Sequence, residues 1–224
     1  MQNLNRATVQ HLISNIRAGM TLTDVRKLCE DYMLENGADS FWYWDVGAFV
    51  FSGDETAVSI SGKEYITSDR MIESNDILTV DLSPQKNNVW GDFARTIIIE
   101  QGKVVEAIEN VQNDEWRKGI EMELFLHQTL LYIAAPEMSF EELYFCINDI
   151  ISKNGFINLD FMGNLGHSIV NNKDDRIYIE NGNGIKLSEA EMFTFEPHIS
   201  RPGSKYGYKR EDIYYFCDGK LVKL

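Results

Sequence analysis

The chain has 224 residues, of which 44% are apolar and 12% aromatic, a composition typical of a globular protein with one substantial core. It carries 21 lysines and arginines against 35 aspartates and glutamates, and its net charge of -14 repels phosphate backbones and anionic lipids. We therefore expect neither nucleic acid nor a membrane among its partners.

The N-terminal residues 1–13 lack the basic start and the unbroken apolar segment of a signal peptide, and no later stretch is apolar enough to span a bilayer. We expect a cytoplasmic protein. Its three cysteines, Cys29, Cys146 and Cys217, form no CxxC pair, so the sequence encodes neither a disulfide framework nor a thiolate zinc site. We expect them to be buried, reduced thiols.

The first part of the chain predicts two helices followed by a strand. Apolar residues at helical spacing, ended by glycine-containing stop signals, indicate helices over residues 5–16 and 21–35. Either Thr21 or Thr23 can cap the second helix. Residues 39–52 are rich in aromatic and β-branched side chains and predict a strand.

Residues 76–99 contain two apolar runs that flank a polar turn. The runs, residues 77–82 and 93–99, predict the two strands of a hairpin. One aspartate accompanies each run, Asp81 inside the first and Asp92 just before the second. A carboxylate within an apolar strand is costly to bury unless it is paired, hydrogen-bonded or bound to a cation. Two such aspartates therefore suggest a metal site.

The second part of the chain again predicts two helices followed by strands. Amphipathic spacing indicates a long helix over residues 110–135. Ser139 and Glu142 then form a capping box that begins a helix over residues 140–153. The chain closes with two strand-like runs, residues 192–199 and 212–217.

A faint internal duplication relates the two parts. The cap and the Asn-Gly stop of the helix over residues 21–35 recur 118 residues later, around the helix over residues 140–153. The same offset, applied to the two aspartates of the hairpin, leads close to Glu196 and Glu211. Two equivalent hairpins would then each supply two carboxylates. Chance similarity between helix and strand sequences explains the repeat equally well.

His167 is a further candidate ligand, because it follows a glycine at which the backbone can turn sharply. A single loop histidine is usually a surface residue. Four carboxylates and one imidazole, however, form an oxygen-rich set that suits two hard or borderline divalent ions better than one tetrahedral zinc.

Six segments occur in order along the chain: AGMTLTDV, TVDLSPQ, GDFARTIII, NLGHS, FTFEPH and KREDIYYF. In these segments the chain resembles the methionine aminopeptidase and Xaa-Pro peptidase family, the dinuclear metallopeptidases of the pita-bread fold. The resemblance extends from about Ile13 to the end of the last segment. A single GH or EP pair is a weak signal, whereas the ordered set, with eleven residues from Asp81 to Asp92, is strong.

The resemblance implies an α+β pita-bread fold, in which a curved antiparallel sheet has two pseudo-twofold related halves and flanking helices. We expect one catalytic-type domain over residues 1–224, without the extra N-terminal domain of the longer Xaa-Pro peptidases and creatinases. Its size therefore does not indicate its substrate.

The resemblance also implies roles for five residues. Asp81 would bind one metal ion, Asp92 and Glu211 would bridge two ions, and His167 and Glu196 would complete the second site. Both ions would be Mn, Co, Fe or Zn, and a water activated between them would attack the scissile carbonyl while Glu196 exchanges protons with it. We expect a metal-dependent exopeptidase that acts on a short peptide or a protein N-terminus, with a homodimer as a candidate assembly.

Active members of the family usually carry two further histidines near the substrate, and this chain supplies neither. Residues 59–61, Ser-Ile-Ser, stand in the first place, and residues 171–175 stand in the second. His198 is a candidate catalytic residue, because alternation along a strand puts it on the same face as Glu196. The alternative is a structural histidine that satisfies the neighbouring carboxylate.

Three further features could contribute to the site. Arg95 is a candidate partner of the carboxylates. The charged run over residues 173–176 is more typical of a solvated loop. Trp42, Tyr43 and Trp44 could line a substrate pocket, although we expect at least one of them in the core.

Three functions remain open. The first is the exopeptidase. The alternative is a binding module that keeps the metal site but lacks peptidase activity, which the missing histidines favour and the complete ligand set opposes. A hydrolase of non-peptide C-N bonds, as in creatinase, ranks last, because creatinase relatives work without metal ions and lack the full carboxylate set.

Overall fold

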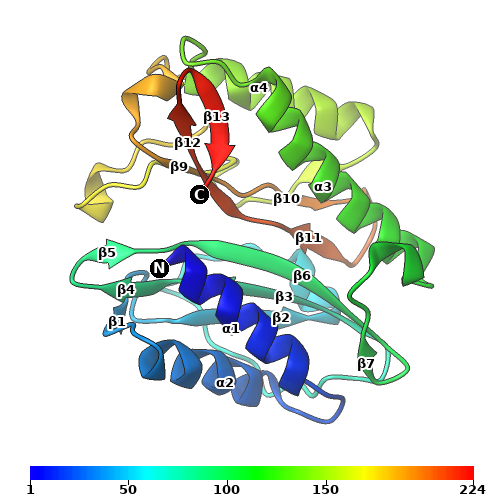
Figure 1. Ribbon diagram of the computed structural model, residues 1–224. Helices are drawn as coiled ribbons and strands as arrows, with labels where there is room; N and C mark the ends of the chain where they lie inside the picture. Colours follow the sequence, from blue (N-terminus) through cyan, green and yellow to red (C-terminus); the bar gives the residue numbers. More distant parts are fainter.

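The computed structural model describes all 224 residues and places the strands between two outer pairs of helices (Figure 1). The helices are α1 (Gln2–Asn15), α2 (Leu22–Glu35), α3 (Asp114–Ile133) and α4 (Phe140–Lys153). The first two helices cover one side of the molecule, and the last two cover the opposite side. All four predicted helices are confirmed, with α3 shorter than expected because the side chain of Asn113 caps it, accepting from the N–H groups of Glu115 and Trp116.

The central sheet has the strand order β2-β3-β6-β7, with antiparallel neighbours. Its strands are β2 (Ala48–Ser52), β3 (Asp76–Leu82), β6 (Phe93–Glu100) and β7 (Lys103–Val104). Strands β3 and β6 pair from Asp76 with Ile99 through Leu82 with Phe93, which confirms the predicted hairpin. Its turn region contains two short strands, β4 (Pro84–Lys86) and β5 (Val89–Trp90), of a sheet completed by β1 (Ser40–Phe41).

The single strand predicted over residues 39–52 is wrong. The chain leaves β1 through a turn in which Trp44 and Asp45 have φ values of 56° and 57°, and it becomes extended again only in β2. The left-handed backbone conformation cannot be part of a strand. A composition rich in aromatic residues did not reveal this turn.

The second-half strands form two three-stranded antiparallel sheets, ordered β11-β10-β8 and β13-β12-β9. They are β8 (Ile157–Asn158), β9 (Phe193–Phe195), β10 (His198–Ser200), β11 (Gly207–Lys209), β12 (Asp212–Cys217) and β13 (Lys220–Lys223). The strand predicted over residues 192–199 is interrupted at Glu196 and Pro197. Proline has no N–H for the ladder, and the N–H of Glu196 instead donates to the carbonyl of Leu165 at 2.9 Å. The two predicted runs do pair, as β9 with β12, and the hairpin continues past the interruption as a second pair, β10 with β11.

The internal duplication is visible in the helices. Helices α2 and α4 each have 14 residues and begin at positions 118 residues apart, Leu22 and Phe140. Each begins with a complete capping box, formed by Thr21 with Asp24 and by Ser139 with Glu142. Thr21, and not Thr23, is the cap. Each box stabilises its helix by about 1 kcal/mol.

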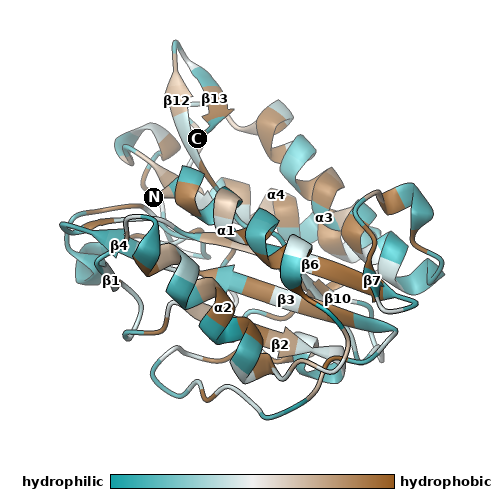
Figure 2. Ribbon diagram, turned by 60° about the horizontal axis from the view of Figure 1, so that its bottom comes forward, coloured by the Kyte–Doolittle hydropathy of each residue, from teal (hydrophilic) through white to brown (hydrophobic).

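Alternation along β3 and β6 decides which side chains reach the second half. Leu78 and Ile97 pack in the core cluster beneath α1 and α2, whereas Ile77 and Ile98 belong to the cluster that contains α3 and α4. Figure 2 shows the corresponding apolar bands on the helices and strands. Asp81 lies four residues after Ile77 and therefore shares its face of the sheet. The hairpin thus points Asp81 toward the second-half strands.

The three cysteines differ in their exposure to solvent. Cys29 is fully buried in α2, and burial raises the pKa of its thiol to about 12. Cys146 and Cys217 are exposed free thiols, so the expectation of three buried thiols is wrong for two of them. Both lie on the outer surface of regular elements, where the sequence pattern gives no burial signal.

None of the four helices has both the length and the apolar character needed to cross a membrane.

Candidate metal centre

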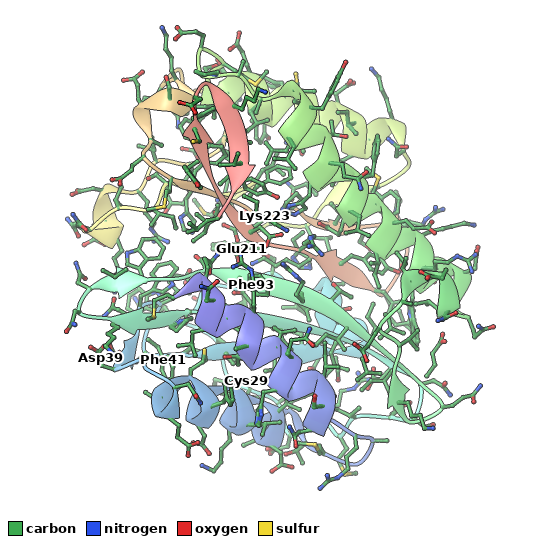
Figure 3. The ribbon with its side chains drawn as sticks, viewed as in Figure 1. Cys29, Asp39, Phe41, Phe93, Glu211 and Lys223 are labelled. Carbon is green, nitrogen blue, oxygen red and sulfur yellow. The ribbon has the colours of Figure 1, made fainter.

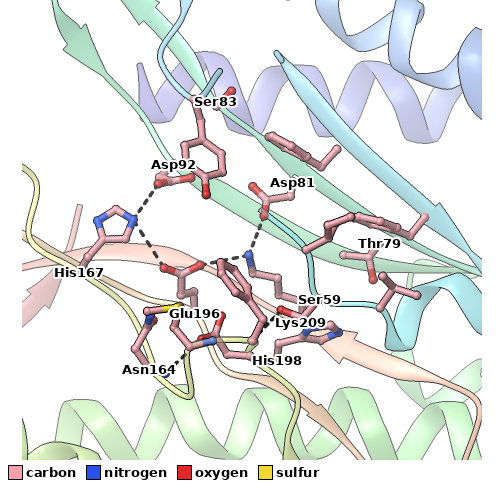
Figure 4. A pocket seen from close by; sticks show the side chains of 18 of the residues that line it. Ser59, Thr79, Asp81, Ser83, Asp92, Asn164, His167, Glu196, His198 and Lys209 are labelled. Atoms are coloured by element: carbon pink, nitrogen blue, oxygen red, sulfur yellow. Dashed lines mark hydrogen bonds and ion pairs between the residues drawn. The ribbon is translucent and has the colours of Figure 1, made fainter. Parts of the chain in front are cut away.

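The five predicted ligands come from both halves of the fold and gather where the second-half strands meet the central sheet (Figures 3 and 4). They are Asp81 on β3, Asp92 just before β6, His167 in the loop between β8 and β9, Glu196 between β9 and β10, and Glu211 between β11 and β12. All except Glu211 line a pocket of about 350 Å³. Glu211 does not line the pocket and is fully buried.

The imidazole of His167 is oriented for ligation. Its Nδ1 lies 3.1 Å from the carbonyl of Ser168. That oxygen can only accept a hydrogen bond, so Nδ1 carries a ring proton and Nε2 is the nitrogen that can bind a metal ion. Nε2 is 3.5 Å from Oδ2 of Asp92 and 3.6 Å from Oε1 of Glu196 (Figure 4). A nitrogen lone pair that faces two carboxylates is stable only when a cation or a proton lies between them.

Gly166 allows His167 to take this position. Its φ is 144°, and a Cβ atom there would lie 2.3 Å from the carbonyl oxygen of Thr194. The N–H of His167 donates to Oγ1 of Thr194 at 2.9 Å, and the N–H of Thr194 donates to the carbonyl of His167 at 2.7 Å. The glycine next to the histidine is therefore required by the backbone conformation and by the close approach of the strand.

Among the five predicted ligands, Glu211 has the environment that most requires a cation. Both of its carboxylate oxygens are buried without a hydrogen-bond partner, and burial, with Asp92 and Glu196 nearby, raises its pKa well above the ordinary value. One ligand atom from each of Asp92, His167 and Glu211 lies within 4.8 Å of the others. Burial also raises the pKa of Asp92 to about 6. Negative groups at such separations are destabilising unless a positive charge joins them.

Asp81 has a different partner from the other predicted ligands. Its Oδ2 lies 2.6 Å from Nζ of Lys209, and the same ammonium lies 3.0 Å from Oε2 of Glu196. Burial alone would lower the pKa of Lys209, but the two carboxylates outweigh it and raise that pKa well above the ordinary value. Burial would likewise raise the pKa of Glu196, and Lys209 reverses that effect. Sequence reasoning missed Lys209, although it stands two residues before Glu211 in KREDIYYF.

His198 lies in the pocket wall rather than among the grouped ligands. Its Nε2 donates to the carbonyl of Thr56 at 2.7 Å, and burial lowers its pKa to about 4. The ring is therefore neutral at physiological pH. It lies opposite Lys209 in the β10–β11 ladder.

Arg95 contacts the main chain of a predicted ligand and not its carboxylate. Its Nη1 donates to the carbonyl of Glu211 at 2.7 Å, and its Nη2 donates to Oδ1 of Asp212 at 2.7 Å. The N–H of Glu211 in turn donates to the carbonyl of Ala94 at 3.0 Å. Arg95 thus fixes the backbone at Glu211. The carboxylate that it contacts belongs to Asp212, the residue after Glu211, so the expected contact with the predicted ligand carboxylates is wrong.

The pocket wall carries an arginine among aromatic rings. The guanidinium of Arg176 lies 5.0, 5.8 and 5.6 Å from the ring centroids of Trp42, Tyr43 and Tyr178, respectively. It forms no ion pair, and its Nε donates to the carbonyl of Lys173 at 2.7 Å. The description of residues 173–176 as a solvated loop is therefore incomplete, because stacking on the rings draws Arg176 to the pocket.

The other residues considered from the sequence are divided between pocket and surface. Trp42 is buried and also lines the pocket, whereas Trp44 is 52% exposed and lies outside it. Ser59 and Ile60, which stand where one family histidine was expected, line the pocket. Oγ of Ser59 accepts a hydrogen bond from the N–H of Phe161 at 3.0 Å.

A model of metallopeptidase family M24 matches residues 1–216 of the chain. The Xaa-Pro dipeptidase of Lactobacillus helveticus is 28% identical over 132 residues, which cover 59% of this chain and 33% of that protein. The Xaa-Pro dipeptidase of Pyrococcus furiosus is 25% identical over 194 residues, which cover 87% of this chain and 51% of that protein. The matches thus span about half of these relatives or less.

Solved structures show the same fold. The X-Pro aminopeptidase of Thermotoga maritima has a TM-score of 0.80 at 22% identity, covering 99% of this chain and 57% of that one. Prolidase from Pyrococcus furiosus has a TM-score of 0.80 at 24% identity, covering 99% of this chain and 60% of that one. These proteins have the pita-bread fold, so the α+β pita-bread class expected from the sequence is confirmed.

Proposed function

Because this chain belongs to metallopeptidase family M24, we propose that it is a metal-dependent exopeptidase that hydrolyses the N-terminal peptide bond of a short peptide. The observation that carries the proposal is the buried carboxylate of Glu211, which has no hydrogen-bond partner and lies beside Asp92 and His167. Such a set is stable when it binds a divalent ion. Similarity to Xaa-Pro dipeptidases supports an aminopeptidase or Xaa-Pro peptidase type of reaction.

The residues present fit a divalent ion. Asp92, His167 and Glu211 supply two carboxylates and one imidazole, and Glu196 adds a further oxygen near His167. This mixture suits Mn, Co, Fe or Zn. When bound, the ion would lower the pKa of a water and polarise the scissile carbonyl.

Glu196 is the residue that we assign to proton transfer. Lys209 keeps the pKa of the Glu196 carboxyl group below its ordinary value. Glu196 is therefore ionised and able to accept a proton from the attacking water. Its Oε1 also accepts a hydrogen bond from Oγ1 of Thr194 at 3.3 Å, which fixes its orientation. The carboxyl group can then return the proton to the leaving amine.

His198 keeps a proposed part in substrate binding. It lines the pocket, but its Nε2–H is committed to Thr56, so the ring can offer only the acceptor Nδ1. Because its Nε2–H is bound to the carbonyl of Thr56, His198 is not free to act as a general acid or base. A neutral acceptor is suited to orienting a peptide N–H.

Arg176 supports a short peptide as substrate. Its guanidinium lies in the pocket wall without an anionic partner, and the aromatic rings around it reduce its freedom. A substrate carboxylate is the natural partner of such a group. A dipeptide or tripeptide places its C-terminal carboxylate close to the scissile bond, whereas a protein N-terminus does not.

Further proposals concern the whole molecule. We propose that residues 1–224 act as one catalytic-type domain and that the protein is cytoplasmic, where its three free cysteines would stay reduced. The net charge of -14 supports the absence of nucleic acid and anionic membranes from its partners. A homodimer is the assembly to test first.

A panel of short peptides tests the proposed function. Protein loaded with Mn²⁺ or Co²⁺ is incubated with Xaa-Pro dipeptides, other dipeptides and Met-initiated tripeptides, and products are identified by mass spectrometry. We expect release of one N-terminal residue from at least one class and loss of that release with a chelator. Metal binding without cleavage of any peptide would instead support the binding module.

A further inference from the structure

The cation already present in the site is the ammonium group of Lys209. It enters from β11 and lies between two predicted metal ligands, 2.6 Å from Oδ2 of Asp81 and 3.0 Å from Oε2 of Glu196 (Figure 4). The side chains of Lys209 and Asp81 are only 17% and 18% exposed. The ion pairs are therefore largely shielded from water.

Three of the other four predicted ligands form a separate group without Asp81, and the fourth, Glu196, lies between that group and Lys209. Asp92, His167 and Glu211 bring their ligand atoms within 4.8 Å of one another, and Asp81 does not belong to this set. An ion bound by Asp81 would have to lie about 2.1–2.6 Å from one of its oxygens. Both oxygens belong to the carboxylate that Lys209 contacts, so such an ion would lie close to the ammonium and be repelled by it.

Lys209 is held where it is. Its N–H donates to Oγ1 of Thr96 at 2.9 Å, and that hydroxyl donates to the carbonyl of Lys209 at 3.2 Å. On its other side, β11 pairs Lys209 with His198. The backbone is thus fixed on both sides, and any movement of the side chain out of the pocket would break two ion pairs.

We propose that the ammonium group of Lys209 takes the place of the second metal ion, so that the site binds one divalent ion through Asp92, His167 and Glu211, with Glu196 beside it. Asp81 then serves as the counter-ion of Lys209 and not as a metal ligand. This revises the two-ion site expected from the sequence. The inference rests on the proposed metal site but does not depend on peptide hydrolysis.

The number of bound ions tests the inference directly. Metal-free protein is titrated with Mn²⁺ in a calorimeter, and the loaded protein is examined by electron paramagnetic resonance, which distinguishes an isolated Mn²⁺ from a coupled pair. The variants are Lys209→Met, which removes the charge but keeps the length, and Lys205→Met, an exposed lysine on the same segment, as the matched control.

We expect one ion and the spectrum of isolated Mn²⁺ for the unmodified protein and for Lys205→Met. Lys209→Met should bind a second ion at least about tenfold more tightly than the unmodified protein does, because a like charge has been removed, and should show a coupled pair. Two ions of similar affinity in the unmodified protein would overturn the inference, as would a Lys209→Met protein that still binds one.

A second pair of variants keeps the test decisive if Lys209→Met does not fold. Asp81→Asn should still bind one Mn²⁺, because Asp81 pairs with Lys209, whereas Asp92→Asn should lose that ion. Loss of the ion in Asp81→Asn would contradict the assignment. All these readouts count ions, so an inactive protein with one ion would refute the proposed function and leave this inference intact.

Discussion

The Nε2 atom of His167 lies 3.5 Å from Oδ2 of Asp92, with its ring proton directed away to the carbonyl of Ser168. Two possible metal-binding atoms therefore face each other in a buried position. Glu211 adds a third such atom within the same small space. This arrangement is expected of a cation's coordination sphere, and it lowers the stability of the folded protein when no cation is bound.

Because these groups are costly to bury without an ion, Glu211→Gln should have opposite effects on the stability of the metal-free and the metal-loaded protein. Glu211→Gln removes a carboxylate that must be either buried as an anion or protonated, so the metal-free protein should gain about 1–3 kcal/mol in its free energy of unfolding. The same variant should lose the stabilisation by Mn²⁺, which at a hundredfold excess over Kd is about 2.7 kcal/mol. Thermal unfolding with and without the ion measures both.

Glu35→Gln, at an exposed position on α2, is the control for this comparison. It should leave both free energies unchanged within about 0.5 kcal/mol. If Glu211→Gln kept the full stabilisation by the ion, Glu211 would not be a ligand.

The backbone at Gly166 should be intolerant of a side chain. Gly166→Ala places a Cβ atom 2.3 Å from the carbonyl oxygen of Thr194 and displaces His167, so we expect a loss of more than about 2 kcal/mol in unfolding free energy and weaker metal binding. Gly163→Ala is the control, because Gly163 also has a positive φ of 78° but open space around it. It should cost only about 1 kcal/mol and leave metal affinity intact. Equal losses would show that the contact with Thr194 is unimportant.

Buried His127 should make stability fall in acid. Its Nε2 donates to the carbonyl of Arg210, Nδ1 accepts from the hydroxyl of Tyr214, and Asp212 lies 3.9 Å away. Burial lowers its pKa from 6.5 to about 3. The folded state then binds fewer protons than the unfolded chain, so stability is complete above pH 6.5 and is lost as the pH falls toward 3, by about 1.4 kcal/mol per unit.

Urea unfolding at pH 7, 6 and 5, with a chelator present, measures that slope. His127→Gln should reduce the slope between pH 6 and 5 by about 1 kcal/mol per unit. His11→Gln, which alters a histidine stacked on Tyr32 in the outer helices, serves as the control and should keep the slope. An unchanged slope in His127→Gln would assign the acid sensitivity to other groups.

Arg176 should affect the binding of substrates that end in a carboxylate. For a cleaved dipeptide, Arg176→Gln should raise KM about 10–100-fold, because a hydrogen bond to a charged group contributes about 1.5–3 kcal/mol, and should change kcat little. The corresponding dipeptide amide should lose no affinity. Arg201→Gln is the matched control, because Arg201 also stacks on an aromatic ring, 5.0 Å from the centroid of Phe156. Equal effects on acid and amide would exclude the proposed contact.

Local patterns in the sequence predicted much of this fold. Apolar spacing and cap residues located all four helices, and the two apolar runs around a polar turn predicted the hairpin of β3 and β6 that carries Asp81. The ordered motifs named the residues that the structure brings together around His167. These features are encoded over a few neighbouring residues, where periodicity and capping chemistry are visible.

Other features depend on contacts between distant segments and could not be read from such patterns. The ion pair of Lys209 with Asp81 joins residues 128 positions apart, and it changes the role expected for the aspartate. Arg176 reaches the pocket because rings from another part of the chain attract it. The interruption at Pro197 was foreseeable from proline chemistry, but the strand pairs on either side of it were not.

The most direct test of the central claim measures metal-dependent cleavage and ion binding together. Unmodified protein and Asp92→Asn are each loaded with Mn²⁺, freed of excess ion, and incubated with the panel of short peptides. We predict that the unmodified protein retains the ion and releases an N-terminal residue, and that Asp92→Asn does neither. A protein that retains the ion and leaves every peptide intact would contradict the proposed exopeptidase.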